Sequence, residues 1–290
     1  MMSIKASVLL LALACNTNAK ALSKRGYRSS TEAICNRAWS NSGSSGKTDC
    51  TGADWIFSSV GDRSSAVSAG LKNSAVTSMA YLSVGTVNTD FPADPRLSAY
   101  TWEENSDSNG QGGLWGDHWF NPDDLVPHIL PIMKDIMDDY KAQGFNAIST
   151  DNAKPSDAVT DNDSVAARHR ANDRIDPRYV EYMAGIVDYA HSIGMKVALK
   201  NPSFYVNEPS IIHKFDAYIV ESLFNWYPYD IDNYNGSPNL LTGSKPMWIF
   251  QYEGINGLSN SKLRERMVEQ GVETTYMDTN NGWVEFHATQ

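Results

Sequence analysis

The chain is poor in cysteine and in positive charge, and it lacks a hydrophobic run long enough to cross a bilayer. Its 290 residues include three cysteines, and 24 Lys and Arg stand against 34 Asp and Glu, which gives a formal net charge of -10. An acidic chain repels phosphate backbones and anionic lipid surfaces. We therefore expect neither a nucleic acid nor a membrane as a partner.

Motifs for phosphate and for metals are also missing or incomplete. Residues 41–48 resemble a phosphate-binding loop, but Asn41 stands where the first glycine belongs and no apolar strand precedes it. The six histidines show no ligand spacing such as His-Glu-x-x-His, so we expect no metal site.

The first 19 residues have the features of a secretory signal peptide. Lys5 supplies the positive start, residues 8–14 form a short apolar run, and residues 17–19 form a small-residue cleavage site. The mature protein is then secreted and extracellular, and only Cys35 and Cys50 remain in an oxidising compartment. We expect these two to form a disulfide, with two free thiols as the alternative. The predicted organisation is a signal peptide (1–19), an N-terminal segment with the disulfide loop (20–50) and one domain (51–290).

One pattern recurs along that domain: an amphipathic helix, a glycine and a short apolar strand. Asn121 and Pro122 begin the clearest helix, whose apolar residues fall at three- and four-residue spacing up to Gly144. Asp176 and Pro177 begin a second unit in the same way, and residues 259–277 form a third.

Strands that alternate with helices predict a parallel sheet. The eight candidate strands are residues 54–59, 76–84, 118–121, 145–150, 195–199, 217–220, 246–251 and 272–277. Polar residues follow several of them at the carboxyl end, which is where the active site of a (β/α)8 barrel lies. An open doubly wound sheet is the alternative, but its glycine-rich first turn is absent. The predicted fold is therefore a single α/β domain of the (β/α)8 TIM-barrel type.

Two carboxylates end otherwise apolar strands, Asp151 after residues 148–150 and Glu221 after residues 218–220. A carboxylate in such a place is costly to desolvate, and one acid alone is readily explained as a core residue satisfied by a neighbour. Two such acids on nearby strands of a barrel fit a glycosidase pair that flanks a scissile bond. We therefore predict Asp151 and Glu221 as the catalytic residues.

Aromatic and polar side chains near the same strand ends predict a groove for sugars. Aromatic rings stack on the apolar faces of sugars, although such residues also serve as core. The predicted substrate-binding residues are Tyr81, Trp119, Asn152, Lys200, Asn201, Trp226, Tyr252 and Asp278.

Five blocks of the sequence resemble, in order, those of glycoside hydrolase family 114. They are Tyr-Leu-Ser-Val-Gly (81–85), Trp-Gly-Asp-His-Trp (115–119), Gly-Phe-Asn-Ala-Ile-Ser-Thr-Asp-Asn (144–152), Ala-His-Ser-Ile-Gly-Met-Lys-Val-Ala-Leu-Lys-Asn (190–201) and Phe-Asp-Ala-Tyr-Ile-Val-Glu (215–221). The likeness covers about residues 54–278. Members of this family are endo-α-1,4-polygalactosaminidases, and the related spherulin-4 family cleaves similar polymers.

The resemblance implies a (β/α)8 fold, no cofactor, and a catalytic pair that corresponds to Asp151 and Glu221. The sequence thus predicts a secreted, monomeric, retaining endo-glycosidase whose partner is an amino-sugar polysaccharide. Asp151 is expected to be the nucleophile or electrostatic stabiliser, and Glu221 the acid/base. Two alternatives stay open: a glycosidase with the same acids that acts on a neutral polysaccharide, and a non-catalytic barrel that binds glycans through its aromatic residues.

Overall fold

The structure is a computed structural model of the whole chain, and we describe the residues whose placement is well defined. These are residues 32–37, 50–61, 65–88, 94–101, 117–153, 175–202, 205–206, 208–221, 223–224, 245–252, 259–270, 274–279 and 282–287. The predicted signal peptide lies outside this described part of the chain.

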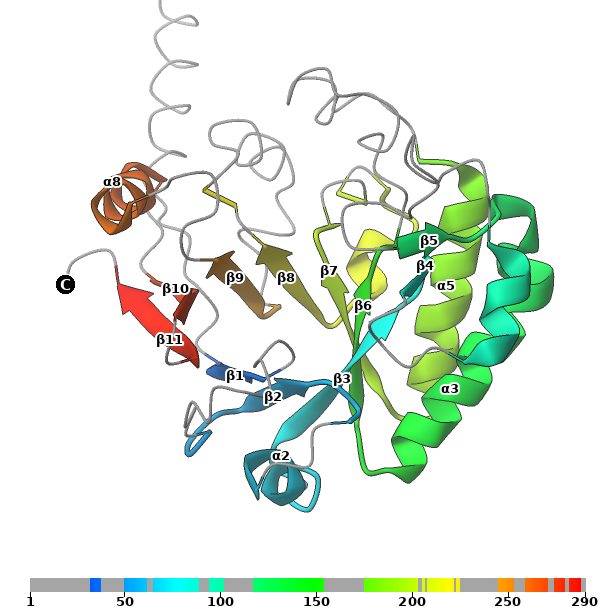
Figure 1. Cartoon of the computed structure of the whole chain (residues 1–290), viewed down its shortest axis with the longest axis horizontal. Coiled ribbons are helices and arrows are strands. Elements are labelled where there is room, and N and C mark those ends of the chain that lie inside the picture. Colours follow the sequence, from blue (N-terminus) through cyan, green and yellow to red (C-terminus); the bar gives the residue numbers. More distant parts are fainter. Residues whose placement is uncertain are drawn as a thin grey trace, which may run out of the picture.

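Eight parallel strands form one curved sheet, and a ninth strand extends it at one edge (Figure 1). The parallel strands, in their spatial order, are β1 (Ile34–Asn36), β2 (Trp55–Ser58), β3 (Thr77–Ser83), β6 (Ala147–Asp151), β7 (Lys196–Lys200), β8 (Ala217–Glu221), β9 (Met247–Tyr252) and β10 (Thr274–Thr279). The ninth, β11 (Gly282–His287), pairs antiparallel with β10. The α/β class and the TIM-barrel type of sheet predicted from the sequence are confirmed.

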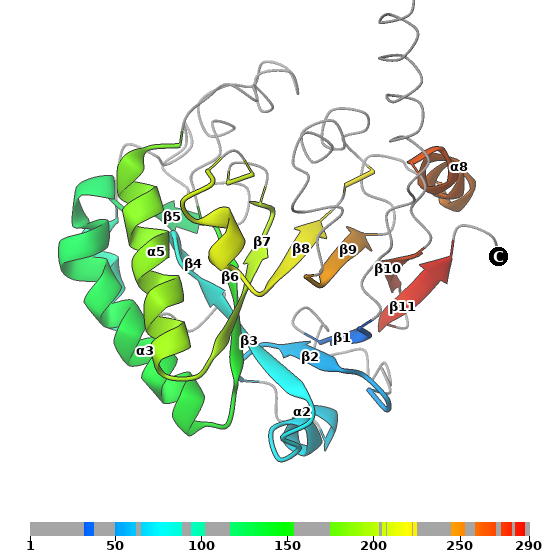
Figure 2. The ribbon, with the colours of Figure 1, turned by 180° about the vertical axis from the view of Figure 1, so that it is seen from behind.

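The α-helices are α2 (Ser65–Gly70), α3 (Leu130–Ala142), α5 (Pro177–Ser192) and α8 (Asn260–Gln270), with shorter helical turns at η1 (Pro95–Tyr100), η3 (Pro122–Asp124), η4 (Leu125–Ile129, a π-helical turn) and η7 (Ile212–Lys214). α3 and α5 lie side by side against β6 and β7 (Figure 2). Among the described residues, no helix has both the length and the apolar character that a membrane crossing needs.

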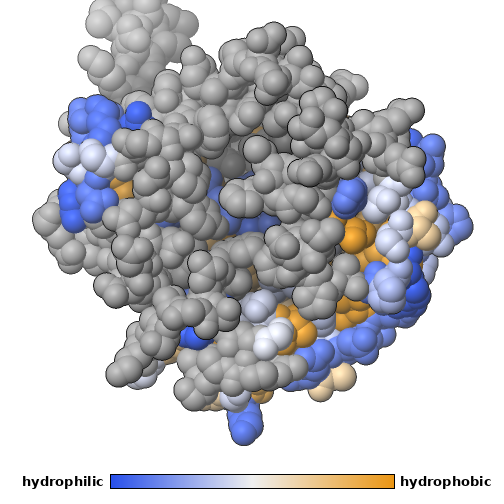
Figure 3. Space-filling view, in the orientation of Figure 1, coloured by the Kyte–Doolittle hydropathy of each residue, from blue (hydrophilic) through white to orange (hydrophobic). Residues whose placement is uncertain are grey.

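The sequence signals for the helix ends are present, although Asn121 caps η3 and α3 itself begins at Leu130. The side chains of Asn121 and Asp176 each accept a hydrogen bond from a backbone N–H two residues ahead, and a proline follows each cap. Gly144 and Gly194 adopt positive φ angles of 101° and 72° just after α3 and α5, which ends both helices. The outer surface formed by α3 is mainly hydrophilic (Figure 3), because its apolar side chains face α5 and the sheet.

Aromatic contacts across the interior show that the sheet curls back on itself. The rings of Trp55 on β2 and Trp248 on β9 have centroids 5.1 Å apart, and those of Phe57 and Phe250 are 6.2 Å apart. β2 and β9 are separated by four strands in the sheet, so in a flat sheet they would lie about 24 Å apart at the usual strand spacing. The sheet therefore wraps around a core of side chains, as in a barrel.

The interior is filled unevenly around this core. The inward positions of β6, β7 and β8 include three alanines, Ala147, Ala198 and Ala217, together with Ile219, whereas the opposite wall carries Trp55 and Trp248. The large rings fill the space that the alanines leave. A second apolar cluster lies between the sheet and the helices α3 and α5.

One strand assignment made from the sequence is wrong, and one strand of the parallel sheet was not predicted. Residues 118–121 were expected to form a barrel strand, but β5 (Asp117–Trp119) pairs with β4 (Thr86–Asn88) in a separate two-stranded antiparallel sheet. The parallel sheet instead includes β1, which lies in the segment predicted to precede the domain. A strand of three residues with one inward side chain or two carries too little periodicity to be found in a sequence.

Cys35 and Cys50 form the predicted disulfide, with Cα atoms 5.4 Å apart. Cys35 lies at the middle of β1 and is buried beside Ile56 and Val67. The bond therefore ties the first strand of the sheet to the turn that precedes β2.

Removing this bond should destabilise the protein without changing its chemistry. The bridge closes a loop with a sequence separation of 15 residues, and in the chain-entropy model such a loop contributes about 3 kcal/mol. A Cys35→Ser, Cys50→Ser double variant should therefore melt at a lower temperature and keep the specific activity of the parent. Two alkylatable thiols in the untreated protein would contradict the bridge.

Candidate active site

Three adjacent strands bring a lysine between two carboxylates. β7 lies between β6 and β8 in the sheet, and each of the three strands ends in a charged residue: Asp151, Lys200 and Glu221. The Lys200 Nζ atom lies 2.7 Å from Asp151 Oδ2 and 3.1 Å from Glu221 Oε1. Both acids predicted as catalytic are thus in contact with the same ammonium group.

Three donors hold the Asp151 carboxylate. Oδ2 accepts hydrogen bonds from Lys200 Nζ and, at 3.0 Å, from the hydroxyl of Tyr81. Oδ1 accepts one from the backbone N–H of Asn152 at 2.9 Å. The carboxylate is 14% exposed, so most of its negative charge is stabilised by these donors and not by water.

The Glu221 carboxylate is held by the residues that end β7. Asn201 Nδ2 donates to Glu221 Oε2 at 3.1 Å, and Asn201 Oδ1 accepts from the Glu221 backbone N–H at 2.9 Å. Oε1 contacts Lys200, and the side chain is 17% exposed. Glu221 is therefore anchored to the end of β7 through both its backbone and its carboxylate.

Asn152 and Asn201 both adopt the left-handed backbone conformation, with φ angles of 53° and 47°. Each stands directly after the charged residue that ends its strand. Few residues other than glycine adopt this conformation, and asparagine is among those that tolerate it best. Such strain is concentrated at functional sites, where the surrounding structure must enforce it.

The loop after β3 provides that enforcement for Asn152. The side-chain amide of Asn152 donates to Ser83 Oγ at 3.2 Å and to Thr86 Oγ1 at 2.9 Å. Gly85 lies so close that a Cβ atom there would be 1.8 Å from the Asn152 carbonyl oxygen. Only glycine fits at this close approach of two backbones.

Lys200 is 1% exposed, so its charge depends on its partners. Burial alone would lower the pKa of Lys200, but the negative charges of Asp151 and Glu221 outweigh that cost, and the pKa is raised above its usual value. The ammonium also lies 5.4 Å from the centroid of the Tyr81 ring, an arrangement that favours a cation. Lys200 is thus positively charged at acidic and neutral pH.

Two buried tyrosines support the strand ends from outside the sheet. Tyr182 donates to the carbonyl of Val84 at 2.7 Å, and Tyr205 donates to the carbonyl of Ala153 at 2.8 Å. Burial raises the pKa of both hydroxyls well above the usual value for tyrosine, so both remain neutral donors. They fix the backbone on either side of Gly85 and Asn152.

Of the remaining predicted site residues, two are buried and three have side chains outside the described part of the structure. Tyr81 is 8% exposed and Trp119 is 7% exposed; Tyr81 bonds Asp151, and Trp119 lies over Gly85. These two rings are packed, whereas the prediction expected them to line a sugar groove. Tyr252 and Asp278 face each other in the register of β9 and β10, but their side chains are outside the described part of the structure, as is all of Trp226.

Sequence reasoning missed the supporting residues. Ser83 could have been found, because it stands two positions after Tyr81 on a strand and therefore points the same way. Thr86, Tyr182 and Tyr205 carry no such signal. Their roles depend on which backbone groups the fold brings within reach.

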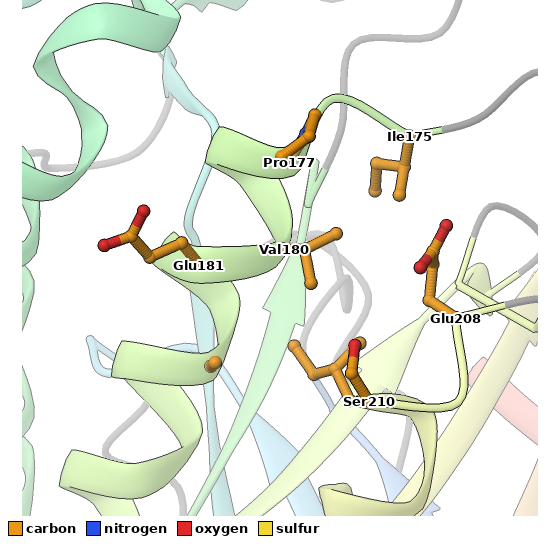
Figure 4. Close-up of a pocket in the computed structure, with 8 residues that line it drawn as sticks. Ile175, Pro177, Val180, Glu181, Glu208 and Ser210 are labelled. Carbon is orange, nitrogen blue, oxygen red and sulfur yellow. The ribbon is translucent and has the colours of Figure 1, made fainter.

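A separate cavity of about 570 Å³ lies outside the barrel wall (Figure 4). It lies between the start of α5 and the loop after β7, and Ile175, Val180, Glu208 and Ile211 contribute to its lining. None of the predicted site residues lines it. Within the described residues there is also no group of three or more His, Cys, Asp and Glu side chains that could hold a metal ion.

Comparisons with known proteins identify the family of this chain. The profile described as glycoside-hydrolase family GH114 matches residues 36–248, which include all of β6, β7 and β8. The chain belongs to this family. It is a glycoside hydrolase, as predicted, and its substrate class is a polysaccharide. A search of curated proteins finds no match.

Solved structures similar to this family 114 chain share its fold. The crystal structure of Ega3 from Aspergillus fumigatus in complex with galactosamine has a TM-score of 0.56 and 16% identity, over 89% of this chain and 94% of that one. The glycoside hydrolase domain of PelA from Pseudomonas aeruginosa has a TM-score of 0.51 and 14% identity, over 84% and 93% of the two chains.

The close approach at Gly85 generates a prediction about this family 114 site. A Gly85→Ala variant must displace the backbone of Asn152, and with it Asp151, because the clash is with backbone atoms. A displacement of about 1 Å costs about 100-fold in rate, so we expect a loss of that order in kcat. Gly61→Ala is the matched control, since a Cβ atom there meets nothing within 4 Å. Equal activity of the two variants would contradict the role of Gly85.

Proposed function

We propose that this protein is a secreted retaining endo-glycosidase that cleaves an α-1,4-linked galactosamine polymer, with Asp151 and Glu221 as its catalytic pair. The observation that carries the proposal is the contact of both carboxylates with Lys200 at the carboxyl end of the barrel strands. Active sites of this fold lie at that end. Family membership supports hydrolysis of a glycosidic bond.

The contacts of the two acids support a division of roles. Three hydrogen-bond donors fix the direction of the Asp151 carboxylate, as attack on the anomeric carbon requires. Glu221 is then the acid/base, which gives a proton to the leaving oxygen and later recovers one. In the first step Asp151 forms a bond to the anomeric carbon while Glu221 protonates the leaving oxygen. In the second step Glu221 removes a proton from the water that releases the sugar from Asp151.

The separation of the acids favours retention of configuration. Since one ammonium touches both, the contacting oxygens lie no farther apart than the sum of the two distances, about 5.8 Å. Retaining enzymes place the two carboxyl groups about 5 to 5.5 Å apart, and inverting enzymes about 6.5 to 9.5 Å. Analysis of the anomeric form of the first product by nuclear magnetic resonance distinguishes the two outcomes.

The charge of the protein supports a cationic substrate. The whole chain carries a formal charge of -10, and the catalytic cluster of two acids and one lysine is itself net negative. Such a surface attracts protonated galactosamine units. The Ega3 structure was determined in complex with galactosamine, which supports the same substrate class.

The direct experiment is turnover of a partly deacetylated galactosamine polymer, such as galactosaminogalactan, by the purified protein. Asp151→Asn and Glu221→Gln should each lower the rate of reducing-end release about 100-fold or more while leaving the fold intact. Glu265→Gln removes an exposed carboxylate paired with Lys262 on α8 and serves as the control. Full activity in either catalytic variant would refute the assignment, and turnover of neutral glucans alone would favour the neutral substrate.

The dependence on salt tests the electrostatic part of the proposal. Raising the ionic strength should raise KM for a deacetylated polymer much more than for an acetylated one, because screening weakens attractions beyond about 8 Å at physiological ionic strength. The measurement is KM for both polymers over a range of salt concentrations. An equal response of the two would show that the acidity of the protein does not guide its substrate.

A further inference from the structure

The ammonium of Lys200 is buried between the two catalytic acids, yet the two-carboxylate reaction needs no lysine. We propose that Lys200 is a positioning residue that holds the two carboxylates in one geometry and sets the pH range in which the pair works. The proposal rests on the function proposed above, since it assigns a role within the same site.

Lys200 acts through the acids and not on the sugar. Its side chain is 1% exposed, and its ammonium is enclosed by Asp151, Glu221 and the ring of Tyr81. Lys200 is therefore not a catalytic residue in the sense of a group that touches the substrate.

The charge of Lys200 changes what the two acids can do together. Two carboxylates a few ångströms apart repel each other, and without a cation one of them keeps its proton to a higher pH. A cation between them removes much of this repulsion and favours loss of the proton. Retaining hydrolysis requires one ionised and one protonated carboxyl group. Lys200 therefore moves the range in which this mixed state exists toward lower pH.

Among the described side chains, the other groups that bond the two acids are neutral. Tyr81 on β3 adds a neutral hydroxyl bonded to Asp151, and Asn201 adds a neutral amide bonded to Glu221. Tyr252 and Asp278 are partners in the register of β9 and β10, and their side chains lie outside the described part of the structure. Lys196 lies on the same face of β7 as Lys200, but its ammonium lies over the ring of Trp55, 4.9 Å from the centroid.

The first experiment compares pH profiles of kcat/KM for the parent and three variants. In Lys200→Met both limbs of the profile should move to higher pH by about one unit or more, with a lower maximum. Lys200→Arg keeps the positive charge in a different shape, so its maximum should fall while the limbs stay in place. Lys196→Met removes a lysine from the same face of the same strand and should leave the limbs unchanged.

The second experiment needs no substrate and so separates this inference from the proposed function. In Lys200→Met the folded protein holds two close, uncompensated acids at neutral pH, whereas at low pH one of them gains a proton and the repulsion ends. The drop in melting temperature relative to the parent should therefore be larger at pH 7 than at pH 4. A residue that only fills space would cause the same drop at both values, as we expect for Lys196→Met.

The outcomes are distinct. Limbs that stay in place in Lys200→Met, together with a melting-temperature drop that is independent of pH, would overturn the role of Lys200. A pH-dependent drop in a protein whose parent hydrolyses none of the polymers would uphold the coupling of Lys200 to the acids and refute the proposed function instead.

Discussion

The organisation of the catalytic face depends on one buried ammonium group. A lysine with a 1% exposed side chain would lose several kcal/mol of hydration without compensation, and Asp151 and Glu221 provide it. The lysine must therefore stand on β7, the middle strand, because only a side chain there can contact acids on both β6 and β8. Ala147, Ala198 and Ala217 lie on the inner face of the same three strands, and Ile219 lies two positions before Glu221.

The site is built on strand ends and is held by polar contacts from neighbouring elements. Asn152 and Asn201 turn the chain immediately after the charged residues, in a backbone conformation that only close support maintains. Ser83 and Thr86 supply that support from inside, while Tyr205 fixes the carbonyl of Ala153 from outside. Side chains placed on rigid strands in this way keep their geometry better than side chains on free loops.

The sequence predicted the parts of this arrangement that follow from local rules. The cap at Asp176 and the period of apolar residues predicted α5, and the same period predicted α3, although Asn121 caps the shorter turn η3 and α3 begins only at Leu130. The position of Asp151 and Glu221 at strand ends placed both acids on one face. The contact partner of Lys200 could not be predicted, because it depends on the order of strands in the sheet. The assignment of residues 118–121 to the barrel failed for the same reason, since a short run such as β5 has no feature that says which strand it will pair with.

The Trp248 indole on β9 donates a hydrogen bond to the backbone carbonyl of Glu32, which lies just before β1. The two residues are 216 positions apart in the chain. A chain emerging from the ribosome cannot make this contact until most of the domain has been synthesised. Until then the aromatic ring of Trp55 lacks the partner that covers it in the finished barrel. Closure of the interior is thus a late event in biosynthesis. The early strands must remain soluble until the later strands have been synthesised.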